Sequence, residues 1–513
     1  MRSAGTHTRA RLGACPEGDG RVSFAVWALG RTSVDVRIRG ARHGLEPSEE
    51  GVWAGSIPAA PGDDYTYVLD GEADRPDPCS RFQPEGIRGP SRVVDPATFA
   101  WTDGAWDGLD LEELVVYELH VGAFTAEGTF DAVIPRLAGL RELGVTAVEL
   151  MPVATFPGNR GWGYDGVYAY APHPAYGGPE GLSRLVDAAH AHDLGVILDV
   201  VYNHVGPGAE AIAAFGPYFT SRRQTPWGDA LDFAESGVRE WALQNACAWV
   251  RDYHVDGLRL DAVFAVFDDG PQHVLAELTE RVRKENPRAL VISETDPDDR
   301  RPLEEWGHDA QWWDGFHHAL HALLTGERDG YYAPYGRVED LARAFQAPDS
   351  GRFVVCAQNH DQVGNRAVGD RLTREQLRVA AACVLLSPFT PLLFMGEEYG
   401  EQRPFQFFTD HVDPRIAQAT REGRRREFAG FAGFAGPEIP DPQDPATFER
   451  SKLAPEHGDA SVRDHYRKLL RLRRKLPRAS PVEFTERPRR LSVRRGPVEL
   501  FVDFDAMTAD VRT

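Results

Sequence analysis

Cysteine is scarce in this sequence: the 513 residues include five, namely Cys15, Cys79, Cys247, Cys356 and Cys383. Their number is odd and they are widely spaced, which argues against a disulfide framework and against a zinc site built on thiolates. Few, scattered thiols are typical of a protein from a reducing compartment. We therefore expect a cytoplasmic protein.

Basic residues are also fewer than acidic ones. The chain has 57 Lys and Arg against 78 Asp and Glu, which gives a net charge of −21. A field of this sign repels nucleic acids and anionic membrane surfaces. We expect no nucleic-acid partner and no membrane partner, and instead a neutral or cationic ligand.

Long uninterrupted apolar runs are missing. The most apolar stretch, VAAACVLLSPFTPLLFMG at 379–396, contains Pro388 and Pro391, so it predicts a helix, a loop and a buried strand instead of a membrane span. The N-terminal residues MRSAGTHTRARLGACPEG lack the apolar core of a secretory signal. The motifs GxxxxGK[ST], GxSxG and HExxH are absent, so three common kinds of active site are not indicated.

Two patterns divide the chain. Residues 1–100 alternate short apolar segments with Gly, Pro and Asp turns, which predicts a small β-sandwich domain. From about residue 112, strand-like runs alternate with stretches of helical periodicity, the pattern of parallel βα units. We assign residues 101–477 to this second domain and residues 478–513, with two or three short strand candidates, to a small C-terminal β region.

Eight strand candidates follow one another in the second domain. They are VVYELHV, AVELMPV, GVILDVV, GLRLDAV, ALVISET, AQWWDG, FVVCAQN and PLLFMGEE. Eight βα units in sequence predict a closed (β/α)8 TIM barrel, so the fold class is α/β. The last barrel helix is predicted in DHYRKLLRLRRKLP.

Polar residues collect where these strands end, which is the face that carries the active site in such barrels. The third strand ends in DVVYNH (199–204), the fourth in Arg259 and Asp261, the fifth in Glu294 and the seventh in NHDQVGN (359–365). Each residue alone has a structural explanation, such as a helix cap or an ion pair. Together they would be costly to desolvate for stability alone, so function is the better explanation.

Glycoside hydrolysis by two carboxyl groups is the chemistry that fits. Arg259, two positions before Asp261 on a strand, points to the same side and would keep Asp261 ionised as a nucleophile. Glu294 follows an apolar run and would keep a raised pKa, as a general acid requires. His204 and His360 would hydrogen-bond sugar hydroxyls, and Asp361 would favour a distorted ring.

Aromatic residues add support for a sugar ligand. The stretch GWGYDGVYAYAP (161–172) offers Trp162, Tyr164, Tyr168 and Tyr170, whose faces can stack on pyranose rings or simply pack a long loop. The histidines of HHALH, namely His317, His318 and His321, have helical spacing but no accompanying carboxylate. We predict no metal and no cofactor.

The blocks DVVYNH, GLRLDAV, SET and NHDQ, in this order at strand ends, resemble the alpha-amylase superfamily of glycoside hydrolases. The resemblance implies a retaining mechanism with Asp261 as nucleophile, Glu294 as general acid/base and Asp361 as transition-state stabiliser. Many amylases bind calcium through the asparagine of the first block, here Asn203. The acidic insertion that completes such a site is not evident, so no required metal is implied.

Longer stretches resemble the malto-oligosyltrehalose trehalohydrolase family within that superfamily. They include ELHVGAFTAEGTFDAVI, GNRGWGYDGVYAYAPHPAYGGPEGL, DAQWWDGFHHALHALLTGERDGYY and FMGEEYGEQRPFQFFTDH. The resemblance implies hydrolysis of the α-1,4 bond next to the terminal trehalose of maltooligosyl trehalose, releasing trehalose and a maltooligosaccharide. A maltooligosyl trehalose synthase would supply this substrate.

The resemblance also implies which residues bind substrate. They are Tyr164, Asp165, His204, Arg259, Leu260, Ala262, Val263, Phe264, Asp314, Gly315, Phe316, His317, His318, Asn359, His360, Gln362, Val363 and Gly364. The family usually ends in a C-terminal β-domain, whereas about 35 residues follow Pro477, so we expect that domain to be reduced or cut short.

Two other functions remain open at this stage. A glycogen branching enzyme has the same sandwich and barrel but transfers the glycosyl group to another chain instead of to water. A carbohydrate-binding or scaffolding protein on a catalytically dead barrel usually lacks one of the carboxylates, whereas Asp261, Glu294 and Asp361 are all present.

Overall fold

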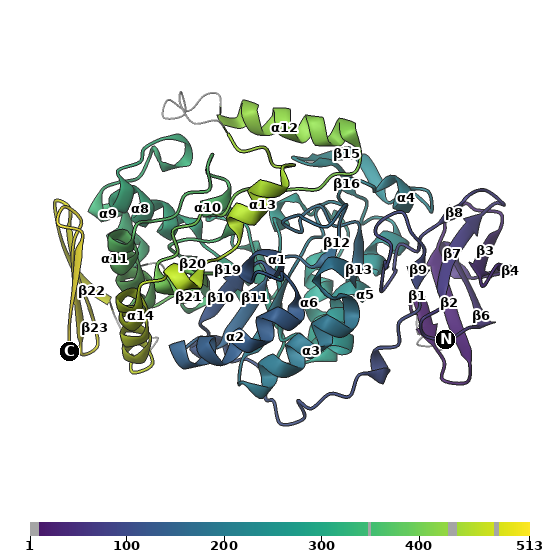
Figure 1. Cartoon of the computed structure of the whole chain (residues 1–513), viewed down its shortest axis with the longest axis horizontal. Helices are drawn as coiled ribbons and strands as arrows, with labels where there is room; N and C mark the ends of the chain where they lie inside the picture. Colours follow the sequence, from purple (N-terminus) through teal and green to yellow (C-terminus); the bar gives the residue numbers. More distant parts are fainter. Residues whose placement is uncertain (1–9, 347–349, 429–438, 477–481) are drawn as a thin grey trace.

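A closed barrel of eight parallel strands forms the centre of the molecule (Figure 1). The computed structural model describes residues 10–346, 350–428, 439–476 and 482–513. In barrel order the strands are β10 (Val116–Leu119), β11 (Ala147–Leu150), β14 (Gly195–Val200), β17 (Gly257–Leu260), β18 (Leu290–Ser293), β19 (Ala310–Trp312), β20 (Phe353–Cys356) and β21 (Thr390–Phe394). Each lies within its predicted run except β21, which begins one residue earlier, and the closed barrel confirms the predicted fold class.

Each barrel strand is buried along its whole length because helices cover the outside and side chains fill the inside. Side chains two positions apart on a strand share one face, so the interior is built in layers. Val116, Ala147 and Ile197 belong to a lower apolar layer. Two positions further along the same strands lie Glu118, Glu149 and Asp199, all buried. Inside the barrel, a layer of acidic side chains therefore lies directly above an apolar layer.

Helices surround the barrel. The longer ones are α2 (Phe130–Leu143), α3 (Gly178–Ala191), α5 (Ser236–Tyr253), α6 (Val274–Glu285), α8 (Asp314–Thr325), α11 (Arg374–Leu385) and α14 (Ala460–Arg473). The sequence signals their ends: Thr373 and Gln376 form a capping box at the start of α11, and Gly144 ends α2. The apolar run at 379–396 becomes α11, a loop and β21, as predicted. The predicted last helix is α14.

Several further elements lie on the upper side of the barrel in Figure 1. They are the hairpin of β15 (Phe219–Thr225) and β16 (Gly228–Leu231), the helix α12 (Pro414–Phe428) and the short helix α10 (His360–Gly364). Arg424 of α12 donates a hydrogen bond to the backbone oxygen of Gly364 at 2.7 Å. This bond fixes α12 to the segment that carries Asp361.

Two antiparallel sheets make up the N-terminal region. One contains β1 (Gly13–Pro16), β2 (Arg21–Trp27), β6 (Val52–Pro58) and β5 (Glu46–Pro47). The other contains β4 (Ala41–Gly44), β3 (Val34–Ile38), β7 (Asp64–Leu69), β8 (Asp74–Arg75) and β9 (Ser91–Arg92). Phe24 and Tyr65 meet edge to face across the two sheets, with ring centroids 5.0 Å apart. The predicted sandwich is therefore present.

A tryptophan joins this sandwich to the barrel. Trp27, at the end of β2, is fully buried and packs edge-on against Tyr218 at 5.1 Å. Its ring lies so close to α5 that a Cβ atom placed on Gly237 would be 2.0 Å from it. Only a residue without a side chain fits there.

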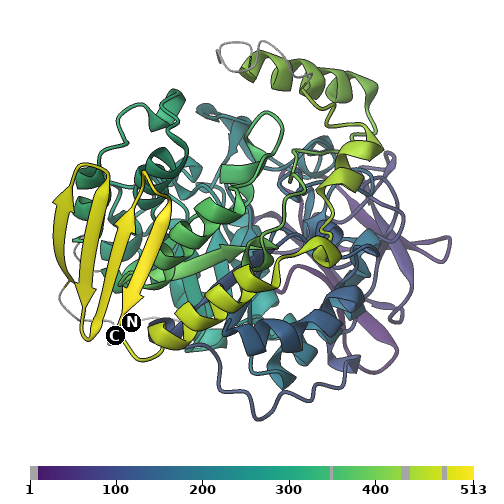
Figure 2. The ribbon, with the colours of Figure 1, turned by 60° about the vertical axis from the view of Figure 1, so that its left-hand side comes forward.

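The C-terminal region differs from the prediction of two or three strands. It forms one antiparallel sheet of four strands, β22 (Val482–Arg487), β23 (Arg490–Arg495), β24 (Val498–Asp503) and β25 (Thr508–Arg512) (Figure 2). Arg489, Gly496 and Met507 have positive φ in the tight connections, where sequence patterns mark strand ends poorly. Arg495 donates to the Ser387 oxygen at 2.6 Å and so ties the sheet to the loop after α11. The predicted boundary at residue 477 lies outside the described residues.

Within the parts of the chain that the structure describes, no helix has both the length and the apolar character needed to cross a membrane.

Replacing Gly237 by alanine should destabilise the protein, because the new methyl group must displace the buried Trp27 ring. We expect a loss of about 1–3 kcal/mol, as for other overpacked cores. Gly139 in α2 is the matched control, since a Cβ there meets nothing within 4 Å. Gly139→Ala should leave stability unchanged or raise it by about 0.5–1 kcal/mol. Chemical unfolding of both variants measures the difference; equal midpoints would contradict the close fit at Gly237.

Candidate active site

One buried guanidinium group lies at the centre of the site. Arg259 on β17 has no exposed surface, and its Nη1 donates to Asp199 at 2.7 Å and to Asp261 at 2.8 Å. Its Nη2 donates to Glu294 at 2.8 Å. The face of the guanidinium lies 4.2 Å from the ring of Trp312. The predicted pairing of Arg259 with Asp261 is present, and the same arginine also holds two further carboxyl groups.

Asp261 follows β17 and is held from two sides. Besides Arg259, the side-chain amide of Asn203 donates to its Oδ2 at 2.7 Å and to its backbone oxygen at 2.9 Å. The next residue, Ala262, has a φ of 40°, a left-handed conformation that costs energy for a residue with a Cβ. This bend aims the Ala262 N–H at Glu294 Oε2, 2.9 Å away.

Glu294, directly after β18, has the environment predicted for a general acid. Burial raises its pKa to about 8, although the nearby charge of Arg259 acts in the opposite direction. Oε2 accepts hydrogen bonds from Arg259 and from Ala262, while the side chain stays 20% exposed. A protonated carboxyl with one face open to a ligand suits proton donation to a leaving group.

Asp361 and His360 form a second charged pair at the start of α10. Burial acts to lower the pKa of His360, but the charges of Asp361 and Glu118 outweigh it and raise that pKa well above its usual value. Glu118 Oε2 accepts from the His360 backbone N–H at 2.9 Å, and Oε1 contacts Nδ1 at 2.5 Å. Burial acts to raise the pKa of Asp361, but His360 lowers it to about 2. Asp361 is therefore an anion beside an imidazolium.

Tyr164 connects the two groups of charges. Its hydroxyl donates to Asp199 Oδ2 at 2.6 Å and contacts His360 Nε2 at 2.7 Å. Its ring stacks on the His360 ring with centroids 5.0 Å apart. A continuous network thus runs from Glu118 through His360, Tyr164 and Asp199 to Arg259.

Some of the residues predicted to bind substrate lie at an open rim. Phe264 is 39% exposed. His318 lies 4.9 Å from the ring of Tyr331, which is 53% exposed. Asp165, in the loop before β13 (Tyr168–Pro172), lies 3.7 Å from His411. Burial raises the pKa of Asp314, the first residue of α8, to about 6.

Other predicted residues have their side chains in the interior. Phe316 packs against Phe389 with ring centroids 5.5 Å apart. His317 contacts the Ala357 oxygen and the Tyr332 hydroxyl, both at 2.9 Å. The side chain of Asn359 caps α10. The remaining members of this group, which are also buried, are Leu260, Ala262, Val263, Gln362, Val363 and Gly364.

The side chains of His204 and Asn203 also contact protein atoms. The ring of His204 contacts the Asn203 amide oxygen and the backbone oxygen of Tyr164. Asn203 donates from its amide nitrogen to Asp261, and its amide oxygen contacts the His204 ring. Within the described chain, no group of three or more His, Cys, Asp or Glu side chains is placed to hold a metal ion.

Three features of the site escaped the sequence analysis. Glu118 lies on the first strand, 242 positions from His360, and no local pattern distinguishes it from a surface glutamate. Trp312 supports the Arg259 guanidinium from within the sixth strand. Trp227, in the β15–β16 hairpin, is 50% exposed and stacks on His204 at 4.7 Å. The sequence feature that could have indicated Trp227 was a tryptophan beside a glycine in a polar hairpin segment.

Replacing Glu118 by glutamine should lower the pKa of His360, because one of the two anions that stabilise its protonated form is lost while burial remains. Glu149→Gln is the matched control. Glu149 is equally buried on the next strand, but burial raises its pKa well above the usual value, so an amide there should change the charge around His360 less. NMR titration of isotopically labelled histidine checks this; an unchanged His360 titration in Glu118→Gln would refute the role of Glu118.

Comparison with known proteins shows the family of this chain. Residues 93–215 match the family model described as the alpha amylase catalytic domain. The malto-oligosyltrehalose trehalohydrolase of Saccharolobus solfataricus is 43% identical, over 88% of this chain and 85% of the relative. The enzyme of the same name from Deinococcus radiodurans is 45% identical, over 91% and 84%. A 1,4-alpha-glucan branching enzyme from Salinibacter ruber is 31% identical, over 78% and 74%.

A solved structure agrees with these sequence matches. The crystal structure of a protein described as an alpha amylase from Salmonella typhimurium superposes with a TM-score of 0.88 at 38% identity, covering 96% of this chain and 93% of the other. The arrangement of β-sandwich, barrel and small C-terminal sheet is thus shared along nearly the whole length. The chain belongs to the malto-oligosyltrehalose trehalohydrolase family.

Proposed function

We propose that this protein is a retaining glycoside hydrolase that cleaves the α-1,4-glucosidic bond next to the terminal trehalose of maltooligosyl trehalose. The products are trehalose and a shorter maltooligosaccharide. The substrate follows from the name shared by relatives 43% and 45% identical over most of this chain. The observation that carries the chemistry is the single guanidinium of Arg259, which holds both Asp261 and Glu294.

The shared guanidinium supports a retaining mechanism. Asp261 and Glu294 each accept from Arg259 at 2.8 Å, on the two terminal nitrogens of one planar group. Two carboxyl groups that accept from one guanidinium are near neighbours, which favours a retaining enzyme, where they lie about 5–5.5 Å apart, over an inverting one, where they lie roughly 6.5–9.5 Å apart. In this proposal Asp261 attacks the anomeric carbon while Glu294 protonates the departing oxygen. Glu294 then removes a proton from the water that releases the sugar.

In this proposal, the charged pair of Asp361 and His360 stabilises the transition state. Because His360, whose ring nitrogens contact Glu118 and Tyr164, holds Asp361 as a partly exposed anion, Asp361 can accept hydrogen bonds from sugar hydroxyls. Such contacts favour the distorted ring of an oxocarbenium-like transition state. Tyr164 and the rim aromatics Phe264, Trp227 and Tyr331 offer faces for neighbouring sugar rings.

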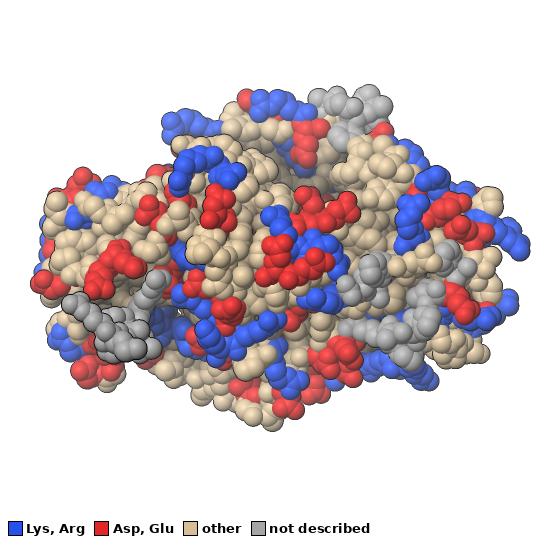
Figure 3. Space-filling view, turned by 180° about the vertical axis from the view of Figure 1, so that it is seen from behind, with Lys and Arg blue, Asp and Glu red and all other residues tan. Residues whose placement is uncertain are grey.

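We further propose a cytoplasmic location and a supply of substrate from a maltooligosyl trehalose synthase. All five cysteines are free, and four are buried, which suits a reducing compartment. On the face seen in Figure 3, basic and acidic side chains are interspersed over the surface. With a net charge of −21, this surface favours a neutral oligosaccharide over a polyanion.

Product analysis tests the function directly. Incubation with maltooligosyl trehalose should release free trehalose, while plain maltooligosaccharide should be cleaved more slowly. Asp261→Ala should lower turnover by a factor of about 10⁴ or more, because no covalent intermediate can form. Circular dichroism of that variant serves as the control for folding. New α-1,6 links from amylose, without release of trehalose, would favour the branching activity of the more distant relative.

The pH dependence of hydrolysis should report Glu294. As general acid it must be protonated, and burial raises its pKa to about 8. The value of kcat/KM should therefore fall as the pH rises through this value, approaching about tenfold per pH unit. Glu294→Gln should lose this alkaline limb when assayed with a substrate whose leaving group needs no proton. A wild-type profile that stays flat up to about pH 10 would contradict the assignment of the acid.

A further inference from the structure

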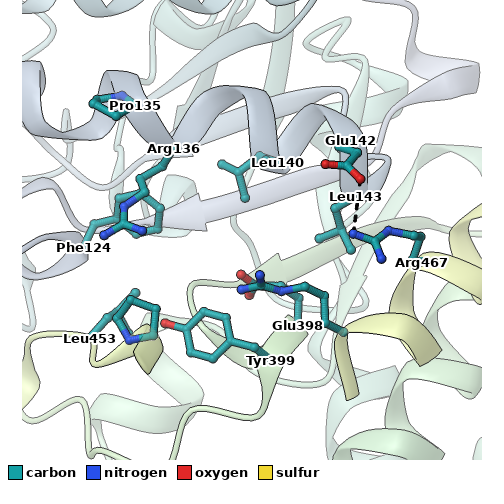
Figure 4. Close-up of a pocket in the computed structure, with 13 residues that line it drawn as sticks. Phe124, Pro135, Arg136, Leu140, Glu142, Leu143, Glu398, Tyr399, Leu453 and Arg467 are labelled. Carbon is teal, nitrogen blue, oxygen red and sulfur yellow. Dashed lines mark hydrogen bonds and ion pairs between the residues drawn. The ribbon is translucent and has the colours of Figure 1, made fainter. Parts of the chain in front are cut away.

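A cavity separate from the candidate active site opens on the outside of the barrel, between α2, the 3-10 helix η8 (Glu397–Tyr399) and α14 (Figure 4). Its volume is about 220 Å³, and none of its lining residues belongs to the candidate active site. Pockets for drug-sized ligands measure roughly 300–1,000 Å³, so this cavity suits a smaller molecule.

Arginine side chains line this cavity in an otherwise acidic protein. They are Arg136, Arg463 and Arg467. Elsewhere arginines typically meet carboxylates, as Arg184 meets Asp131 at 2.8 Å. Among the described residues, Arg136 and Arg463 form no ion pair, and Arg463 instead lies 5.4 Å from the ring of Tyr399. Both guanidinium groups therefore lie at the cavity outside any ion pair, although the charge of Arg463 acts on the nearby carboxyl group of Glu398.

Two donors in the same cavity lack an acceptor. Neither the hydroxyl of Tyr399 nor the Nε of Arg467 has a hydrogen-bond partner within the described part of the chain, and both atoms are buried. Arg467 uses its terminal nitrogens for Glu142 at 3.4 Å and Asp464 at 2.9 Å. A buried polar group without a partner costs about 1–3 kcal/mol. An oxyanion in the cavity would accept from these donors and neutralise the free guanidinium groups.

The other residues that line the cavity are compatible with a bound anion and leave room for the carbon atoms of a small ligand. Figure 4 shows Arg136 reaching down from α2, with Tyr399 on the opposite wall and Phe124, Leu140 and Leu453 around them. Glu398 also lines the cavity. Burial raises its pKa to about 7, which reduces its negative charge near neutral pH.

We propose that this cavity binds a small phosphate-bearing ligand, held by Arg136, Arg463 and the hydroxyl of Tyr399. Phosphate fits better than a single carboxylate because its dianion matches two unpaired guanidinium groups and its oxygens accept several hydrogen bonds at once. Inorganic phosphate and a monosaccharide phosphate share this chemistry. The apolar lining distinguishes them, because only the ester can bury carbon atoms against it.

Calorimetric titration of the full-length protein with inorganic phosphate, and separately with glucose 6-phosphate, tests the proposal at constant ionic strength. Both should bind, with the ester tighter if the apolar lining contributes, and neutral glucose should not. The double variant Arg136→Ala, Arg463→Ala should weaken binding at least about tenfold. Arg42→Ala removes an exposed arginine from β4 and should leave binding unchanged.

A second variant fills the cavity without removing charge. Gly139 lines the cavity and has open space where its Cβ would be, so Gly139→Trp should fold and should block binding. Release of trehalose by each variant verifies that the protein is intact. The proposal is overturned if the wild-type protein binds neither phosphate nor the ester, or if Gly139→Trp and the double arginine variant bind as the wild type does.

Discussion

A single positive charge inside the barrel determines how the candidate active site is assembled. Arg259 is completely buried, and taking a guanidinium out of water costs several kcal/mol unless it is fully paired. Asp199 and Asp261 pair with one terminal nitrogen and Glu294 with the other, while Trp312 covers the face. These partners come from the third to sixth strands, so the charge is tolerated only when the barrel is closed. The same contacts that pair its two terminal nitrogens also position Asp261 and Glu294, while its Nε has no hydrogen-bond partner among the described residues.

Two carboxyl groups of the site, Glu294 and Asp361, differ in charge because their immediate partners differ. Glu294 keeps a raised pKa because burial outweighs the nearby positive charge. Asp361, beyond it, is held ionised by His360. The difference originates in local surroundings: Glu294 has one open face, and Asp361 has a cation beside it that Glu118 in turn supports. A carboxyl group with a raised pKa and one with a lowered pKa thus coexist within one network, because each has its own immediate partner.

Much of this arrangement was predictable from local sequence. Eight apolar runs predicted the eight strands. Because the carboxyl ends of parallel strands lie at one face of a barrel, the polar residues that follow these runs were predicted to gather there. Asp261, Glu294 and Asp361 are among them. The contact of Glu118 with His360 was not predictable, since it depends on the closure of the barrel between its first and eighth strands, which brings the segment after the seventh strand to the first. Burial of Phe316 and His317 was also missed, because the DGFHH segment begins a helix and only packing decides which side faces inward.

The fit between Trp27 and Gly237 bears on the evolution and engineering of this protein. A module that can be exchanged between proteins meets its neighbour through a polar surface, whereas here an indole ring enters the space left by a missing side chain. Excision of the N-terminal sandwich would leave an apolar socket on α5 open to water. The two parts are therefore constrained to change together, and grafting this barrel onto a different sandwich requires transplanting the tryptophan and its glycine as a pair.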